Sequence, residues 1–316
     1  MASHSRLRAF QRQAYIAPPF SNAVPRQPPT KKKLREFFTM DTIPLKTFEN
    51  VLAGSGGEFR HKSAKEYHDL ASQVCQAVQR GCFLWKQKDP NNRFEAPDLH
   101  DLGCIMRRVQ ECTNARVMST GLWASASYLS YRPSTLSLAR DLMRAGTFGR
   151  IRAFSGVEAS FRQILRTNRD ADAIFIVGEL CFGQKKYAEC IDRQRKALAL
   201  TDGHFEWKKE SKLCMAKALC EFGRYDDAIP ILLGLSEQGV AQADMELGKI
   251  YRNQDPERAY ECFFAAACAG LFEAFRPLSD MAFDLGEQTG FTKQEASLWA
   301  TQWAYLADQQ IAAGGS

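Results

Sequence analysis

The sequence repeats one pattern of small residues at an offset of 31 positions, from Ala228 to Ala259. In each copy an alanine is followed eleven residues later by a glycine, then at steps of four by a second alanine and a leucine. The two copies consist of Ala228, Gly239, Ala243 and Leu247, and of Ala259, Gly270, Ala274 and Leu278. Four matches at a single offset indicate a structural unit that recurs along the chain.

The spacing within this pattern is typical of two helices joined by a short turn. Alanines such as Ala228 and Ala259 let two helices approach closely, and glycine can end a helix in the left-handed conformation. We therefore expect Gly239 and Gly270 to close the second helix of their hairpins. No segment alternates apolar and polar residues for long enough to predict a strand. The sequence predicts an all-α fold, an α-solenoid of stacked helix hairpins.

The second copy and its surroundings resemble the Sel1-like repeat, a relative of the tetratricopeptide repeat (TPR). The matching residues are Ala243, Leu247, Gly248, Tyr251, Asp255, Ala259, Phe263, Ala266, Ala267 and Gly270. Upstream, the sequence is closer to the tetratricopeptide form, in which Gly223 is the turn glycine and Tyr225 follows it. Two residues depart from that pattern, because Cys190 replaces an alanine and Gln194 stands where an aromatic residue is usual.

The chain divides into five segments by composition and pattern. They are a basic leader (1–35), a Pro/Gly-rich linker (36–62), N-terminal helices that are either a cap or degenerate repeats (63–131), the TPR/Sel1-like repeats (132–311) and a flexible tail (312–316). Weaker copies at each end of the repeat segment bring the expected number of hairpins to five. Within the linker, a short helix is expected around Leu34 to Met40.

The N-terminal helices have clear start signals. Ser63 and Glu66 form a capping-box pattern, which satisfies the free amide groups at the start of a helix. Apolar residues then recur at steps of three and four from Tyr67 to Val78, as on one face of a helix. Further helices are expected after Pro97 and around 118–129.

Positive charge is concentrated in the leader. Residues 1–35 contain eight Lys and Arg and no acidic residue, so that the remaining chain carries −2 of the total +6. The leader resembles a mitochondrial transit segment, with Leu7, Phe10 and Ala14 on one face of a helix and arginines off that face. A basic tail on a cytosolic protein, or a nuclear sorting signal at Lys31–Lys33, is the alternative.

No motif for catalysis or cofactor binding is found in the sequence. The nucleophile elbow, the kinase signature and the phosphate-binding loop are missing, and the glycines at 54–57 lack the following Lys-Ser/Thr. The histidines have no metal-ligand spacing and are expected on the surface: His4, His61, His68, His100 and His204. Ten cysteines favour small buried thiols in a reducing compartment, with disulfides as the alternative. We expect no enzyme, no cofactor, no metal site and no small-molecule substrate.

The resemblance to helical-repeat proteins implies a concave groove lined by the first helix of each hairpin. The repeat register places the following residues there: Phe175, Glu179, Phe182, Leu213, Lys217, Met245, Lys249, Arg252, Arg276, Asp280 and Phe283. Their mixture of aromatic, methionine and charged side chains suits recognition of a protein partner. For Phe175 and Phe182 the alternative is packing between helices.

The sequence thus favours an adaptor or scaffold that binds protein partners during assembly or quality control of a mitochondrial complex, with the matrix as the favoured location. The alternatives are an RNA-associated mitochondrial translation factor or ribosome-associated protein, and a cytosolic or nuclear adaptor. The charge of −2 outside the leader argues against nucleic acid. No run of 18 apolar residues predicts a membrane span, and peripheral association with a membrane stays open.

Overall fold

The structure, a computed structural model, describes residues 38–59, 61–81, 94–109, 112–200, 205–285 and 292–314. In these ranges all regular structure is helical, and no strand occurs. The expected all-α fold is confirmed. The chain forms two compact units that divide between residues 176 and 177, inside helix α8 (Ala171–Gly183).

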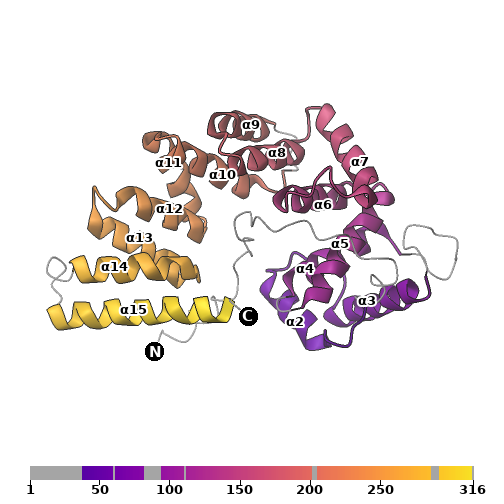
Figure 1. Cartoon of the computed structure of the whole chain (residues 1–316), viewed down its shortest axis with the longest axis horizontal. Coiled ribbons are helices and arrows are strands. Elements are labelled where there is room, and N and C mark those ends of the chain that lie inside the picture. The colour runs from indigo at the N-terminus through magenta and orange to yellow at the C-terminus, as the bar shows by residue number, and fades with distance from the viewer. Residues whose placement is uncertain are drawn as a thin grey trace. The chain divides into compact units, whose positions relative to one another are not determined.

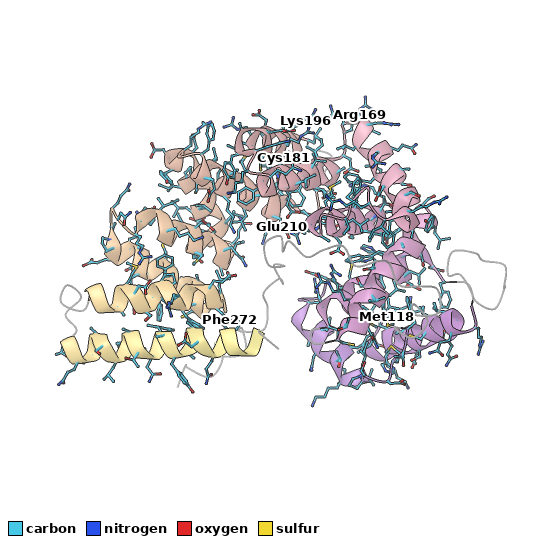
Figure 2. All side chains as sticks on the ribbon, viewed as in Figure 1. Met118, Arg169, Cys181, Lys196, Glu210 and Phe272 are labelled. Atoms are coloured by element: carbon cyan, nitrogen blue, oxygen red, sulfur yellow. The ribbon has the colours of Figure 1, made fainter. Side chains whose placement is uncertain are left out.

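The described part of the first unit runs from residue 38 to residue 176 and is built from antiparallel helix pairs (Figure 1). Its elements before α8 are α2 (Leu45–Gly54), α3 (Ala64–Gln79), α4 (Ala96–Arg108), α5 (Thr113–Tyr128), α6 (Arg132–Arg144), the short 3-10 helix η2 (Arg152–Phe154) and α7 (Ser155–Arg166). Helix α4 packs against α5, and α5 packs against α6. Met118 of α5, labelled in Figure 2, lies fully buried in the core that α2, α3, α4 and α5 share.

The start of α3 has the expected capping box. The Ser63 hydroxyl accepts a hydrogen bond from the Glu66 amide, and the Glu66 carboxylate accepts one from the Ser63 amide at 2.7 Å. The apolar stripe that follows faces the core, with Tyr67, Ala71 and Val74 completely buried. Both local predictions for this helix are confirmed.

The prediction of a linker over residues 36–62 is wrong for the part that the structure describes. Phe38, Ile43 and Phe48 are 4%, 0% and 0% exposed, and they belong to the core of the first unit. Helix α2 begins directly after Pro44 and packs against α3 and α4. The apolar residues are too widely spaced for a periodic pattern, so that only their contacts with α3 and α4 reveal their role. Residues 38–40 are not helical, and residues 34–37 of the expected short helix lie outside the described residues.

The described part of the second unit continues from residue 177 to residue 314 as stacked helix hairpins. Its helices after α8 are α9 (Tyr187–Ala199), α10 (Lys208–Glu221), α11 (Tyr225–Ser236), α12 (Ala241–Tyr251), α13 (Pro256–Cys268), the short η3 (Phe272–Ala274), α14 (Phe275–Leu285) and α15 (Lys293–Gly314). Figure 1 shows α10 to α15 following one another in chain order, and each contacts the next. Counting α6 and α7, five helix pairs occupy the predicted repeat segment.

The turns between helices have the expected left-handed glycines. The φ angles of Gly239 and Gly270 are 75° and 87°, so both residues end a second helix as predicted. Gly223 has a φ of 77° in the turn between α10 and α11. Lys185 occupies the corresponding position between α8 and α9, with a φ of 60°. Unlike glycine, lysine has a Cβ atom and adopts this left-handed conformation at a steric cost.

Small residues and one polar pair set the distance between helices in the second unit. Ala228 and Ala259 are completely buried, as their place in the repeat predicts. Gln194, at the position of the usual aromatic residue, is also completely buried, and its Oε1 accepts a hydrogen bond of 2.7 Å from the Ser211 hydroxyl. A hydrogen bond between α9 and α10 therefore takes the place of an aromatic contact.

Candidate protein-binding face

Two ion pairs place the first helices of three successive hairpins next to one another. Lys217 on α10 lies 3.5 Å from Glu246 on α12, measured from Nζ to Oε1. Arg252, which follows the last residue of α12, lies 3.5 Å from Asp280 on α14, measured from Nη2 to Oδ2. We call the surface made by Lys217, Glu246, Lys249, Arg252, Arg276 and Asp280 the first-helix face.

Four charged side chains of this face are solvent-accessible, whereas those of Lys217 and Glu246 are only 29% and 13% exposed. The side chains of Lys249, Arg252 and Asp280 are 53%, 45% and 49% exposed. Lys249 also pairs with Glu246 at 2.9 Å, so that Glu246 lies between two lysines. An exposed ion pair such as Arg252–Asp280 contributes only about 0–1 kcal/mol. A charged partner can therefore replace this pair at small cost.

Four further predicted residues, on α8, α10 and α12, are half-buried. Leu213 and Met245 are half-buried and pack against the core of the second unit. Phe182 is half-buried and packs against Tyr187, with ring centroids 5.7 Å apart. Glu179 is half-buried on α8. These four predicted residues are thus less accessible than the charged ones.

Of the remaining predicted residues, Phe175 does not contribute to this face. Phe175 is 0% exposed, and the Arg140 guanidinium lies 4.8 Å from the centre of its ring, so the alternative of packing between helices holds for Phe175. It also belongs to the first unit. The side chain of Phe283 lies outside the described residues. Arg276 is exposed and pairs with Asp308 of α15 at 3.8 Å.

The prediction that the histidines lie on the surface is wrong for His100, which is 8% exposed. Its Nδ1 lies 2.9 Å from the Ser134 hydroxyl, and its Nε2 lies 3.6 Å from the sulfur of Cys104. Burial lowers the pKa of His100 to about 4. The imidazole is therefore neutral at pH 7 and does not form an ion pair with a Cys104 thiolate. Its partner Ser134 lies 34 residues away on α6, so that the neighbouring residues in the sequence give no signal for this burial.

No disulfide bond joins two of the described cysteines, and Cys82 lies outside the described residues. Cys75, Cys181 and Cys190 are buried as expected, whereas Cys268 is exposed. The sulfurs of Cys190 and Cys214 lie 3.7 Å apart, between α9 and α10. Within the ranges that the structure describes, no group of three or more His, Cys, Asp or Glu could hold a metal ion. In the same ranges no helix has the length and apolar character needed to cross a membrane.

Stacked hairpins with adjacent first helices define an α-solenoid of helical repeats. Among solved structures, a Sel1 repeat protein from Oxalobacter formigenes is similar, with a TM-score of 0.51 and 18% identity over 78% of this chain and 99% of that one. The fold is therefore that of Sel1-like repeat proteins, as the sequence resemblance predicted. A protective antigen present in uropathogenic Escherichia coli strains gives a TM-score of 0.48 and 18% identity over 83% of this chain and 52% of that one. No protein-family model and no curated protein sequence matches the chain.

Proposed function

We propose that this protein is a non-enzymatic helical-repeat adaptor that binds a protein partner on its first-helix face. The observation that carries the proposal is the pairing of Lys217 with Glu246 and of Arg252 with Asp280. These pairs join α10, α12 and α14 into one continuous accessible surface. Such a surface suits an extended or helical segment of a partner, which contacts several repeats at once.

The chemistry of the face indicates what this partner segment contains. Lys249 and Arg252 are exposed cations, and Asp280 is an exposed anion. A segment with charges of both signs can exchange these intramolecular pairs for intermolecular ones. Half-buried Met245 offers an adaptable apolar contact.

Site-specific photo-crosslinking in the native source tests the proposal. A photoreactive amino acid is placed at Lys249, and in a matched control at Glu261, an exposed position on the second helix α13. The proposal predicts one crosslinked protein for position 249 and not for position 261. The double substitution Lys217→Glu with Arg252→Glu, combined with the probe at 249, should abolish that crosslink while the helical circular dichroism spectrum is retained.

Two outcomes would contradict this assignment of the binding face. Equal crosslinking from positions 249 and 261 would show that the first-helix face is not selective. A crosslink that survives both charge reversals would show that the exposed charges do not recognise the partner.

We further propose that the partner belongs to a mitochondrial complex whose assembly or quality control the adaptor serves. The leader, which lies outside the described residues, supports this location through its eight basic residues and its lack of acidic ones. Residues 1–35 fused to a fluorescent protein should enter the matrix, whereas a fusion with Arg6, Arg8 and Arg12 changed to Glu should stay outside. A diffuse wild-type fusion would instead favour the cytosolic or nuclear adaptor.

A further inference from the structure

The last described helix has one covered side and one exposed side. Ala296 and Ala307 of α15 are buried, and α15 packs on this side against α14 and η3. Phe272 of η3, labelled in Figure 2, lies beside α15. Another side of α15 exposes four large apolar residues: Leu298 (64%), Trp299 (46%), Tyr305 (58%) and Leu306 (36%). Trp299 lies at the edge of this side, where it stacks on Trp303 of the same helix with ring centroids 6.1 Å apart. Nothing in the described part of the chain covers this side.

The exposed residues recur at the spacing of a helix that packs along another helix. Leu298 and Tyr305 are seven positions apart, as are Trp299 and Leu306. Two exposed glutamines, Gln302 and Gln309, are also seven apart on the same side. A seven-residue repeat keeps the same side chains in contact with a neighbouring helix over successive turns. We call these six residues the α15 outer face.

The rest of the unit shows how such a side is normally covered. Helix α11, a second helix, is covered by the next first helix α12, and α13 is covered by α14 in the same way. The α15 outer face has the corresponding place in the fifth hairpin. A helix is therefore the element that fits it.

The chemistry of the α15 outer face favours another copy of α15 as that helix. No charged residue occurs from 296 to 307, so two copies can approach without repulsion between like charges. Each Gln302 amide has both a hydrogen-bond donor and an acceptor, and two such amides can pair with each other. The side of α15 is thus complementary to itself, as an interface on a twofold axis requires.

We propose that the protein forms a homodimer through antiparallel packing of two copies of α15, with Gln302 on the twofold axis. In this register Leu298 faces Leu306 of the second copy, and Trp299 faces its Tyr305. The two Asp308 carboxylates are then twelve residues apart along the helices, which is about 18 Å. A parallel arrangement would bring them together. This inference does not depend on the proposed first-helix face.

The test measures the mass of the full chain by light scattering and by sedimentation at increasing micromolar concentrations. The expected species has twice the monomer mass of 35.6 kDa. Gln302→Glu and Gln302→Lys should each weaken the dimer by about tenfold or more, because like charges then meet at the axis. An equimolar mixture of the two variants should restore it, because opposite charges meet instead. All variants should retain the wild-type melting temperature of the monomer.

The matched control is Phe222→Ser, which removes a ring that is 55% exposed at the end of α10 and should leave the dimer unchanged. A wild-type protein that stays monomeric at every concentration overturns the proposal, and leaves the α15 outer face to a different partner. Dimers that persist in both charged variants, or a mixture that fails to restore the dimer, overturn the register with Gln302 on the axis.

Discussion

Gly248 and Gly234 are both glycines inside helices, yet their surroundings are opposite. A Cβ atom added to Gly248 would lie 2.6 Å from the ring of Phe263, which is buried and cannot move away. A Cβ atom added to Gly234 would have no neighbouring atom within 4 Å. Gly248 therefore allows α12 and α13 to approach closely, whereas Gly234 only lowers the stability of α11.

Alanine substitutions at these two glycines should have effects of opposite sign. Gly234→Ala should raise the free energy of unfolding by about 0.5–1 kcal/mol, because alanine favours the helix over glycine. Gly248→Ala should lower it by about 1–3 kcal/mol, because overpacking outweighs that preference. Urea unfolding followed by circular dichroism measures both. Stabilisation by both substitutions would show that α12 and α13 are farther apart than described.

His100 makes the stability of the first unit dependent on pH. Its pKa is about 4 in the folded chain because of burial, compared with 6.5 for an ordinary histidine. As the pH falls from 6.5 towards 4, the unfolded chain gains a proton that the folded chain does not bind. The contribution of His100 to stability is therefore greatest above pH 6.5 and decreases through this window.

His100→Gln should remove this contribution to the pH dependence. Between pH 7 and pH 4, the wild type should lose about 3 kcal/mol more of its free energy of unfolding than the variant, in proportion to the pKa difference. Denaturant titrations of both proteins at several pH values measure the difference, and acidic residues common to both cancel. Parallel pH profiles would indicate that His100 is accessible to water in the folded chain.

At the scale of elements, Arg132 ties the start of α6 to the start of α8. Its Nε donates to Asp170 at 2.7 Å, and its Nη2 donates to Asp172 at 2.8 Å. The Asp172 side chain is only 1% exposed. Asp170 also accepts a hydrogen bond from the Ala173 amide in the first turn of α8. One guanidinium thus holds two carboxylates that position α8.

Arg132→Ala should destabilise the first unit by about 2–3 kcal/mol, because the almost completely buried Asp172 then loses its ion pair with Arg132. The stability of Arg132→Lys should lie between those of the wild type and Arg132→Ala, since an ammonium group cannot form the same forked contact. Arg224→Ala is the control, because Arg224 pairs with the exposed Asp227 and its loss should cost less than about 1 kcal/mol. Thermal unfolding measures all three. Equal effects of Arg132→Ala and Arg224→Ala would exclude a structural role for the contact with Asp172.

At the scale of the whole molecule, each unit has a core of its own. One core extends from Phe38 to Ala126, and the other extends from Cys181 to Ala307. The charge outside the leader is −2, and the charges on the first-helix face have both signs. This distribution favours a protein partner over a polyanion.

Residues 36–316 should accordingly bind bulk RNA only weakly at physiological salt, because few phosphates can be neutralised. Filter binding and fluorescence anisotropy at two salt concentrations measure the affinity for RNA. The full chain is measured alongside to show what the basic leader adds. Submicromolar binding by residues 36–316 that falls steeply with salt would favour the RNA-associated translation factor over the adaptor.

The sequence by itself determined the helical class, the order of the hairpins and several helix ends. The capping box at Ser63, the left-handed glycines at 239 and 270 and the buried alanines of the repeat were all predictable. Each depends on hydrogen bonds within one helical turn or on a spacing that recurs along the chain. Such local features are stabilised by residues close in sequence, so the amino-acid pattern alone reveals them.

Only the tertiary structure decided which side chains are covered. Phe38 and His100 are buried by helices that lie far from them in the sequence, and Gln194 is satisfied by Ser211 of the next hairpin. Phe175 is buried, although the repeat register places it with exposed residues of the first-helix face. Burial depends on which neighbour packs against a given side of a helix, and helical periodicity does not encode that neighbour.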